Sequence, residues 1–375
     1  MSQVVVAGGG LAGSATAIAL AQAGRQVTLL EREAAPADKI CGEFLSTEAQ
    51  ACLSRLGVDF HKLGGHSITH VRLVRGYQSV AAKLPFEGLG LTRMALDECL
   101  LAHASSAGVS VQRGQTIRRI SFEGATQVDI DGAAPLNPQA LFLATGKHEV
   151  RGARRDATAS QLVGFKTYFR LCPAQQAALA SHVELYVFPG GYAGLQLVEG
   201  GRANLCFLVE AAMLARAGGK FAVLLDQLQT ICPQLGVRLA GAEDLLPAPL
   251  TIARVPYGFI HRPQASDPAG MFRLGDQAAV IPSFTGDGMA IALHSATLAA
   301  DYFLRGKTSA AYHRRFAQDV SGQIRRAAAL HMALTAPGLS SVVFAAARLF
   351  PRALALSASL TRVPANRLVP GRQAA

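Results

Sequence analysis

The chain has 375 residues, half of them hydrophobic, which is enough to bury a large core in one to three domains. Its formal net charge of +11 is compatible with nucleic acid, but the arginines are spread out and lack interleaved aromatic residues, so we expect no nucleic-acid partner. No stretch reaches the roughly 18 uncharged apolar residues of a membrane span, and the six cysteines lack the spacing of a zinc site or a disulfide framework, so we expect a cytoplasmic protein without a metal.

A strand, a glycine turn, a helix and a second strand open the chain. Residues 3–7 are apolar and β-branched, residues 14–23 have helical spacing, and residues 27–30 form a strand that ends at Glu31. Between them, Gly8, Gly10 and Gly13 satisfy G-x-G-x-x-G. Gly8 permits the turn, Gly10 lets a pyrophosphate approach the backbone, and Gly13 lets the helix pack close to the sheet.

This opening unit predicts a dinucleotide site. The helix N-terminus attracts phosphate, while the Glu31 carboxylate suits the two hydroxyls of an adenosine ribose. The alternative is a tight strand–helix turn without a ligand. The expected cofactor-binding residues are Gly8, Gly10, Leu11, Ala12, Gly13, Glu31 and Arg32.

The next segment contains a cysteine that follows the acid-bearing strand. In a dinucleotide fold the chain there returns towards the reactive end of the cofactor, so the Cys41 thiol is a candidate catalytic group. The alternative is a small buried apolar cysteine, which residue type alone favours.

The middle of the chain alternates between two kinds of pattern. Helices are expected over 46–56 and 91–107, and a buried strand over 141–146 ends in Ala-Thr-Gly, where Thr145 and Gly146 can pass under a cofactor. Two strands within 68–84, and strands over 161–171, 183–188, 193–198, 203–209 and 251–257, alternate with period two. They predict a separate antiparallel sheet with one buried face and one polar or ligand-facing face.

A second glycine-rich turn follows the strand over 271–276. Asp276 at its end can accept hydrogen bonds from a ribityl chain, and the loop through Gly286 and Gly288 leads into a helix over 289–304. The N–H groups of that loop can lie against a flavin ring edge. An N-capped helix with a plain glycine turn is the alternative.

The tail from Gln323 is helical and basic, and residues 342–350 are strongly apolar. The simpler interpretation, which we prefer, is a helix pair packed on the body. The sharper one is a surface helix that contacts a membrane through the arginines, which are Arg325, Arg326, Arg348, Arg352, Arg362, Arg367 and Arg372.

Together these motifs resemble the FAD-dependent oxidoreductases of the para-hydroxybenzoate hydroxylase superfamily, and residues 39–43 (Lys-Ile-Cys-Gly-Glu) look most like its geranylgeranyl reductase branch. The resemblance covers about residues 1–305 and implies an α/β fold: a Rossmann-like FAD-binding domain of the GR2 type, an antiparallel-sheet substrate domain and a C-terminal helical segment. It implies FAD-binding parts over 1–66, 91–150 and 269–322, substrate-domain parts over 67–90 and 151–268, and a tail over 323–375.

The resemblance also implies further site residues. Arg93 is expected near the cofactor, and Tyr192 is expected to contact the substrate. The other expected FAD contacts are Thr145, Gly146, Gly275, Asp276, Pro282, Gly286, Asp287, Gly288 and Met289.

Two departures bear on activity. Lys147 follows Gly146 where the hydroxylases carry an Asp-Gly motif, which opens the choice of reductant. The segment 189–194 keeps the Pro, Gly and Tyr of the reductase substrate motif without its Trp; the chain has no Trp at all, which argues against the flavin halogenase branch.

Three functions are compared. The sequence favours a monooxygenase with non-covalent FAD, reduced by NADH or NADPH, acting on a hydrophobic aromatic, polyketide-like or lipid-like substrate. The alternatives are a reductase of prenyl double bonds and a non-catalytic FAD protein. Turnover without O2 distinguishes the first two, while oligomeric state stays open.

Overall fold

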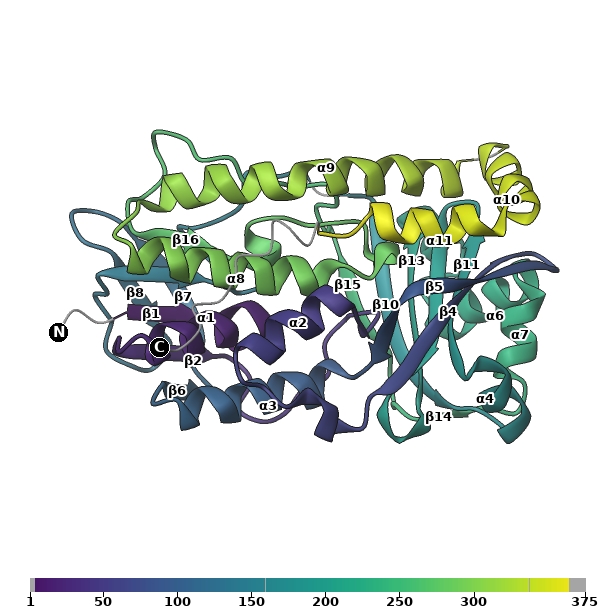
Figure 1. Ribbon diagram of the computed structural model, residues 1–375, viewed down its shortest axis with the longest axis horizontal. Coiled ribbons are helices and arrows are strands. Elements are labelled where there is room, and N and C mark those ends of the chain that lie inside the picture. Colours follow the sequence, from purple (N-terminus) through teal and green to yellow (C-terminus); the bar gives the residue numbers. More distant parts are fainter. Residues whose placement is uncertain (1–3, 159, 337, 364–375) are drawn as a thin grey trace.

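The computed structural model describes residues 4–158, 160–336 and 338–363. The molecule is elongated, with a parallel sheet at one end and a larger mixed sheet at the other (Figure 1). Long helices run along one side and join the two ends (Figure 1).

The parallel sheet is built from short, fully buried strands. Val4 and Val6 of β1 face one layer and Val5 and Ala7 face the other, so both faces are covered, as parallel sheets require. In spatial order the strands are β16 (Met271–Arg273), β9 (Ala140–Leu143), β1 (Val4–Ala7), β2 (Val27–Glu31) and β6 (Ser110–Arg113).

Helices cover one face of this sheet and a small hairpin covers the other. The helical layer consists of α1 (Leu11–Gln22), α2 (Thr47–Arg55), α3 (Arg93–Ser106) and α8 (Gly288–Leu304). The hairpin consists of β7 (Ile117–Ser121) and β8 (Gln127–Ile130). Ser46 and Thr92 cap α2 and α3 by accepting from Ala49 N and Ala95 N, so these helices begin where the sequence predicts.

The second sheet is antiparallel, as expected, except at one strand pair. β4 and β11 pair in parallel, whereas the other paired strands of this sheet in the described chain are antiparallel. The expected strand over 251–257 is shorter, since β15 ends at Ala253. The order is β14 (Glu243–Asp244), β10 (Leu162–Arg170), β13 (Ala203–Glu210), β12 (Gly191–Leu197), β11 (Ser181–Phe188), β4 (His66–Arg75), β5 (Gln78–Gly90) and β3 (Phe44–Leu45), with β15 (Leu250–Ala253) also on β10.

The two faces of β10 separate as the alternation predicts. Val163, Phe165 and Phe169 pack into an apolar core beneath a group of helices. Lys166 and Tyr168 are buried on the opposite face, where they meet the loop after β2. The helices over the apolar core are α4 (Pro173–Leu179), α5 (Ala211–Arg216), α6 (Phe221–Ile231) and α7 (Pro233–Leu239), and the expected break lies between α5 and α6.

The C-terminal segment packs on the body. The helix α9 (Ser309–Thr335) runs unbroken through the expected boundary at 322/323. It is followed by α10 (Leu339–Leu349) and α11 (Pro351–Leu360), whose inner residues pack against the substrate sheet. Arg367 and Arg372 lie outside the described residues. In the described chain no single helix could cross a membrane by its length and hydropathy, although α9 and α10, bent by 104°, pass that test as a pair.

Candidate active site

The glycine turn after β1 is held by very close packing. Gly8 has a φ of +108°, and a Cβ on Gly13 would lie 1.8 Å from the Gly8 carbonyl oxygen, so neither position accepts a larger residue. Gly13 therefore packs α1 against β1 and does not line the cavity in front of the turn. Gly10, Leu11 and Ala12 do line it.

Glu31 stands at the end of β2 beside this turn. Its two carboxylate oxygens accept hydrogen bonds from Gly9 N at 2.6 Å and from Glu33 N at 2.9 Å. The side chain is buried yet lines the cavity, so it is oriented before any ligand binds. Arg32 also lines the cavity but is exposed and pairs with Glu33.

Two cations stand over Gly10. A Cβ there would lie 3.2 Å from Arg93 Nη2 and 3.9 Å from Lys39 Nζ. Both cations pair with Asp97, Arg93 at 3.0 Å and Lys39 at 2.9 Å. They suit a pyrophosphate at the helix N-terminus. Lys39 was not among the predicted cofactor contacts. Its position two residues before Cys41, in the segment expected to return towards the cofactor, could have indicated it.

The two later motifs meet at the end of β9. Gln277 Nε2 donates to the carbonyl oxygens of Gly146 and His148, both at 2.9 Å. Lys147 Nζ lies 3.0 Å from Asp276 Oδ2, and both side chains line the cavity. Burial opposes the Lys147 charge, but the neighbouring groups that favour the charge, with Asp276 first among them, together raise the pKa of Lys147. The predicted ribityl acceptor thus has a cation beside it that the sequence did not reveal.

Only some of the residues expected to contact FAD from the loop before α8 line the cavity. Gly286, Gly288 and Met289 line the cavity, whereas Pro282 and Asp287 do not. Asp287 is turned into the protein, where its Oδ2 accepts from Val363 N at 3.1 Å and its Oδ1 lies 3.6 Å from Arg362. Burial raises the pKa of Asp287 to about 8 against the lowering effect of Arg362. The side chain therefore ties down the C-terminal segment, which corrects its expected contact with FAD.

The loop that carries Cys41 is anchored to the substrate sheet. Asn204 Nδ2 donates to the carbonyl oxygens of Cys41 and Gly42 at 3.1 and 3.0 Å. Gln196 Nε2 donates to the Glu43 carbonyl oxygen at 2.8 Å. Glu43 itself has a φ of +60°, which a non-glycine residue rarely adopts.

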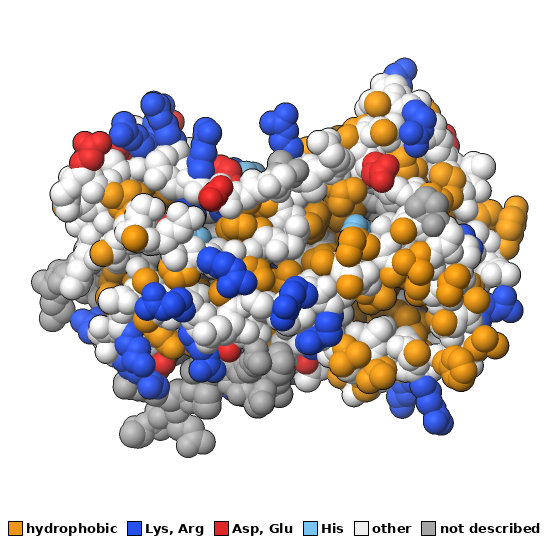
Figure 2. All heavy atoms as spheres, turned by 90° about the horizontal axis from the view of Figure 1, so that it is seen from above, with side chains coloured by type: hydrophobic (Ala, Val, Ile, Leu, Met, Phe, Trp, Pro, Cys, Tyr) orange, Lys and Arg blue, Asp and Glu red, His pale blue; other side chains and the backbone are white. Residues whose placement is uncertain are grey.

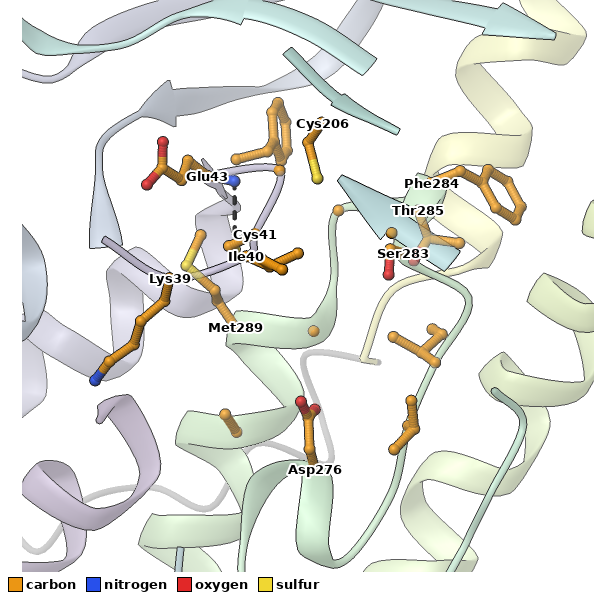
Figure 3. A pocket seen from close by; sticks show the side chains of 18 of the residues that line it. Lys39, Ile40, Cys41, Glu43, Cys206, Asp276, Ser283, Phe284, Thr285 and Met289 are labelled. Atoms are coloured by element: carbon orange, nitrogen blue, oxygen red, sulfur yellow. Dashed lines mark hydrogen bonds between the residues drawn. The ribbon is translucent and has the colours of Figure 1, made fainter. Parts of the chain in front are cut away.

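The Glu43 side chain completes this anchor. Its Oε1 accepts from Lys166 Nζ at 2.6 Å and from Arg93 N at 2.8 Å, and the Tyr168 hydroxyl lies 2.8 and 2.9 Å from its two oxygens. Burial raises the pKa of Glu43, and the charge of Lys166 offsets that effect only in part. Figure 3 shows this loop together with Cys206, Asp276 and the 283–285 segment around one cavity.

A single cavity of about 1040 Å³ joins these features. Its lining includes Glu31, the glycine turn and Cys41, residues of the substrate sheet such as Tyr192, and residues of the C-terminal helices. Its far part is lined mostly by aliphatic side chains, among them Val71, Leu73, Leu185, Leu334, Val343 and Leu354. Cys41 and Tyr192, the expected catalytic and substrate residues, both line it.

The near half of the cavity fits FAD. The acceptor at Glu31, the cations over Gly10 and the Asp276–Lys147 pair would suit an adenosine ribose, a pyrophosphate and a ribityl chain, respectively. The glycine loop before α8 lies beyond them, where a flavin ring would rest. In the described chain no group of three or more His, Cys, Asp or Glu side chains could hold a metal ion.

Comparison with known proteins gives the same picture. The family model described as pyridine nucleotide-disulphide oxidoreductase matches residues 1–76. Menaquinone reductase of Mycolicibacterium smegmatis is 25% identical over 327 residues, covering 81% of this chain and 77% of that protein. Digeranylgeranylglycerophospholipid reductase 2 of Methanopyrus kandleri is 25% identical over 334 residues, covering 84% and 80%.

Among solved structures, the myxobacterial chondrochloren halogenase CndH matches with a TM-score of 0.77 at 18% identity, over 98% of this chain and 94% of that one. At that identity the likeness shows a shared fold. Fold, motifs and relatives together define a flavin-dependent redox enzyme. The chain is an FAD-dependent oxidoreductase that is similar, over most of its length, to these two reductases.

Proposed function

We propose that this protein is a flavoprotein monooxygenase that hydroxylates a hydrophobic, lipid-like or aromatic substrate. The observation that carries the proposal is the continuous cavity, whose polar half fits FAD and whose apolar half runs between the substrate sheet and the C-terminal helices. A long apolar substrate lying in that half would bring one end to the Cys41 loop.

The protein's own residues bind, orient and exclude water. Non-covalently bound FAD would supply the redox chemistry. Arg93 and Lys39 would hold its pyrophosphate, Asp276 its ribityl chain, and the loop at Gly286 its ring edge. The aliphatic wall would keep water from the reacting carbon. Acid precipitation of the purified protein should release free FAD into the supernatant, and a yellow pellet would contradict the non-covalent assignment.

Three of the thiol and hydroxyl groups that line the cavity are too weakly acidic to favour double-bond reduction. Saturating an alkene requires a proton as well as a hydride, and so requires an acid beside the second carbon. Burial raises the pKa of Cys206 and of Tyr257 to about 12 and that of Tyr192 well above its usual value, which makes all three poor donors. The missing tryptophan in segment 189–194 also departs from the reductase motif.

The second candidate is reduction of an isoprenoid double bond. It is favoured by the two relatives that match over most of their length, whose names describe reductases, and by the Cys41 thiol, which lines the cavity.

Oxygen dependence decides between the two. Purified protein, NADH or NADPH and a long-chain phenolic lipid are incubated with labelled O2, and a long-chain prenyl lipid is incubated without O2. A labelled hydroxyl group in the phenolic product supports the monooxygenase. A saturated product formed without O2 refutes it in favour of the reductase. Oxidation of the reduced flavin by O2 without a hydroxylated product, together with no saturated product in the O2-free arm, refutes both.

Two further parts of the proposal concern the source of electrons and the place where the enzyme meets its substrate. NADH or NADPH is proposed as the reductant, which stopped-flow bleaching of the flavin by each nucleotide would test. A cytoplasmic enzyme with such a substrate would meet it at a membrane surface, and peripheral contact through the basic C-terminal helices is therefore proposed as well.

A further inference from the structure

The outer side of the two last helices is unusually apolar for a protein surface. Large hydrophobic side chains there are half to three-quarters exposed, and Figure 2 shows hydrophobic side chains gathered over the end of the molecule where α10 and α11 lie, with the surface hollowed among them. These residues are Leu339, Val342, Leu349, Phe350, Leu356 and Leu360, and we call them the apolar platform.

The only charged residues in the two helices that carry the platform are positively charged. After Asp319 the sequence contains no aspartate or glutamate. Arg348 and Arg352 are exposed within α10 and α11. Arg362 is not available, because it is buried and paired with Glu48 at 3.2 Å. A surface with apolar side chains and adjacent free arginines is the pattern of helices that lie in the interface of an anionic bilayer.

The cavity reaches the surface within this platform. Ala346, Phe350 and Ala353 line the cavity and are exposed as well, so they mark an opening where α10 ends and α11 begins. On the inner side of the same helices, Phe344 and Ala347 are buried against the substrate sheet. The two helices therefore form both a wall of the cavity and the rim of its mouth.

We propose that the apolar platform docks on an anionic lipid bilayer and that a lipid-like substrate passes from the acyl layer through the mouth at Ala346, Phe350 and Ala353. The second step rests on the proposed function, and the docking itself does not. An apolar mouth in water leaves its lining exposed to solvent at a cost in free energy, whereas an apolar mouth pressed into acyl chains offers a continuous path of similar polarity.

The charges favour a bilayer over a second copy of the chain. A two-fold contact through the platform would bring each patch against the same patch, so Arg348 and Arg352 would face helices α10 and α11 of the other copy, which carry no carboxylate. Anionic head groups supply the missing negative charge, and each arginine near such a surface strengthens binding at low salt.

The absence of tryptophan from the natural chain gives a direct test of docking. Leu349→Trp places a single indole on the platform, and Ser105→Trp places one on the exposed side of α3. Holoenzyme is titrated with vesicles of phosphatidylglycerol and phosphatidylcholine, or of phosphatidylcholine alone. Emission from the platform indole should shift to the blue with anionic vesicles at low salt, and that from α3 should not. No shift of the platform indole refutes docking.

A second pair of variants tests substrate entry. Leu349→Ser/Leu356→Ser removes platform side chains that do not line the cavity, and Val223→Ser/Val237→Ser removes exposed valines from α6 and α7. The platform variant should bind anionic vesicles at least about tenfold more weakly, since each leucine loses apolar burial. It should turn over vesicle-embedded substrate more slowly while handling a short, water-soluble analogue normally. The valine variant should match the natural protein in both assays.

The outcomes separate the two proposals. Equal loss on embedded and soluble substrates would overturn the entry route. A platform that makes the protein dimeric in vesicle-free solution, with no vesicle binding, would show that a second copy covers it instead. Absence of turnover on any substrate, together with a clear blue shift of the platform indole, would refute the proposed function and leave docking supported.

Discussion

Replacing Lys166 by methionine is expected to destabilise the protein by removing a cation from a buried pair. Lys166 is fully buried, and its Nζ donates to Glu43 Oε1 at 2.6 Å and to the Lys39 carbonyl oxygen at 2.9 Å. Methionine keeps most of the apolar stem, so the change tests the charge. The variant leaves a buried carboxylate without a cation.

The expected loss lies near the lower end of what broken buried pairs cost. Removing one partner of such a pair typically costs about 3–5 kcal/mol. Glu43 would still accept hydrogen bonds from Tyr168 and Arg93, so we expect about 3 kcal/mol at neutral pH. The pKa of Glu43, already raised by burial, would rise further. Because the folded state would then hold a proton that the unfolded chain loses above about pH 4.5, the unfolding free energy should fall as the pH rises.

Urea unfolding of the holoenzyme, followed by circular dichroism at pH 5.5 and pH 8, measures both effects. Arg170→Met is the matched control on the same strand, because its ion pair with Glu243 is mostly exposed and should change stability by less than about 1 kcal/mol at either pH. Glu43→Gln in the Lys166→Met background should recover much of the loss. A Lys166→Met effect no larger than the control, or one that is equal at both pH values, would refute this account of the anchor.

Three other changes have expected outcomes. Glu31→Ala should weaken FAD binding roughly ten- to a hundredfold, by about 1.5–3 kcal/mol, because the ribose and Gly9 N both lose an acceptor; flavin fluorescence titration measures this, and unchanged affinity would exclude the ribose contact. Cys41→Ala should slow turnover with FAD still bound, and wild-type turnover would show that the thiol only fills space. For Asp287, a pKa of about 8 in the folded state lies far above the unfolded value of 3.8, so stability should fall as the pH rises between them. Asp287→Asn should remove that slope in urea melts across pH 5 to 9, and identical slopes would contradict burial as the cause.

The local parts of the site could be predicted because each is a short pattern with a fixed geometric meaning. The turn at Gly8 and Gly13 and the acid at Glu31 follow from strand–turn–helix spacing. The alternation of β10 placed Lys166 and Tyr168 on the polar, ligand-facing side, and the structure puts them on the face that meets the FAD domain.

What could not be predicted depends on partners distant in sequence. From the sequence, Asp287 is a loop aspartate like any other. Its partner, the backbone N–H of Val363, lies 76 positions later in the chain. The parallel pairing of β4 with β11 depends on the path of the chain through α3 and the parallel sheet, which alternation within each strand does not encode. The inward face of α10 was visible as an apolar run, but the cavity wall it forms was not.

The anchoring of residues 41–43 sets where this enzyme can be cut and recombined. Their backbone carbonyl oxygens accept hydrogen bonds from Asn204 and Gln196. The next two residues form β3, which is a strand of the substrate sheet. A chimaera that transplants the substrate sheet of a relative onto this FAD domain at a boundary near residue 66 would separate the loop from the side chains that shape it. A graft that carries residues 38–45 along with the incoming sheet would keep them together.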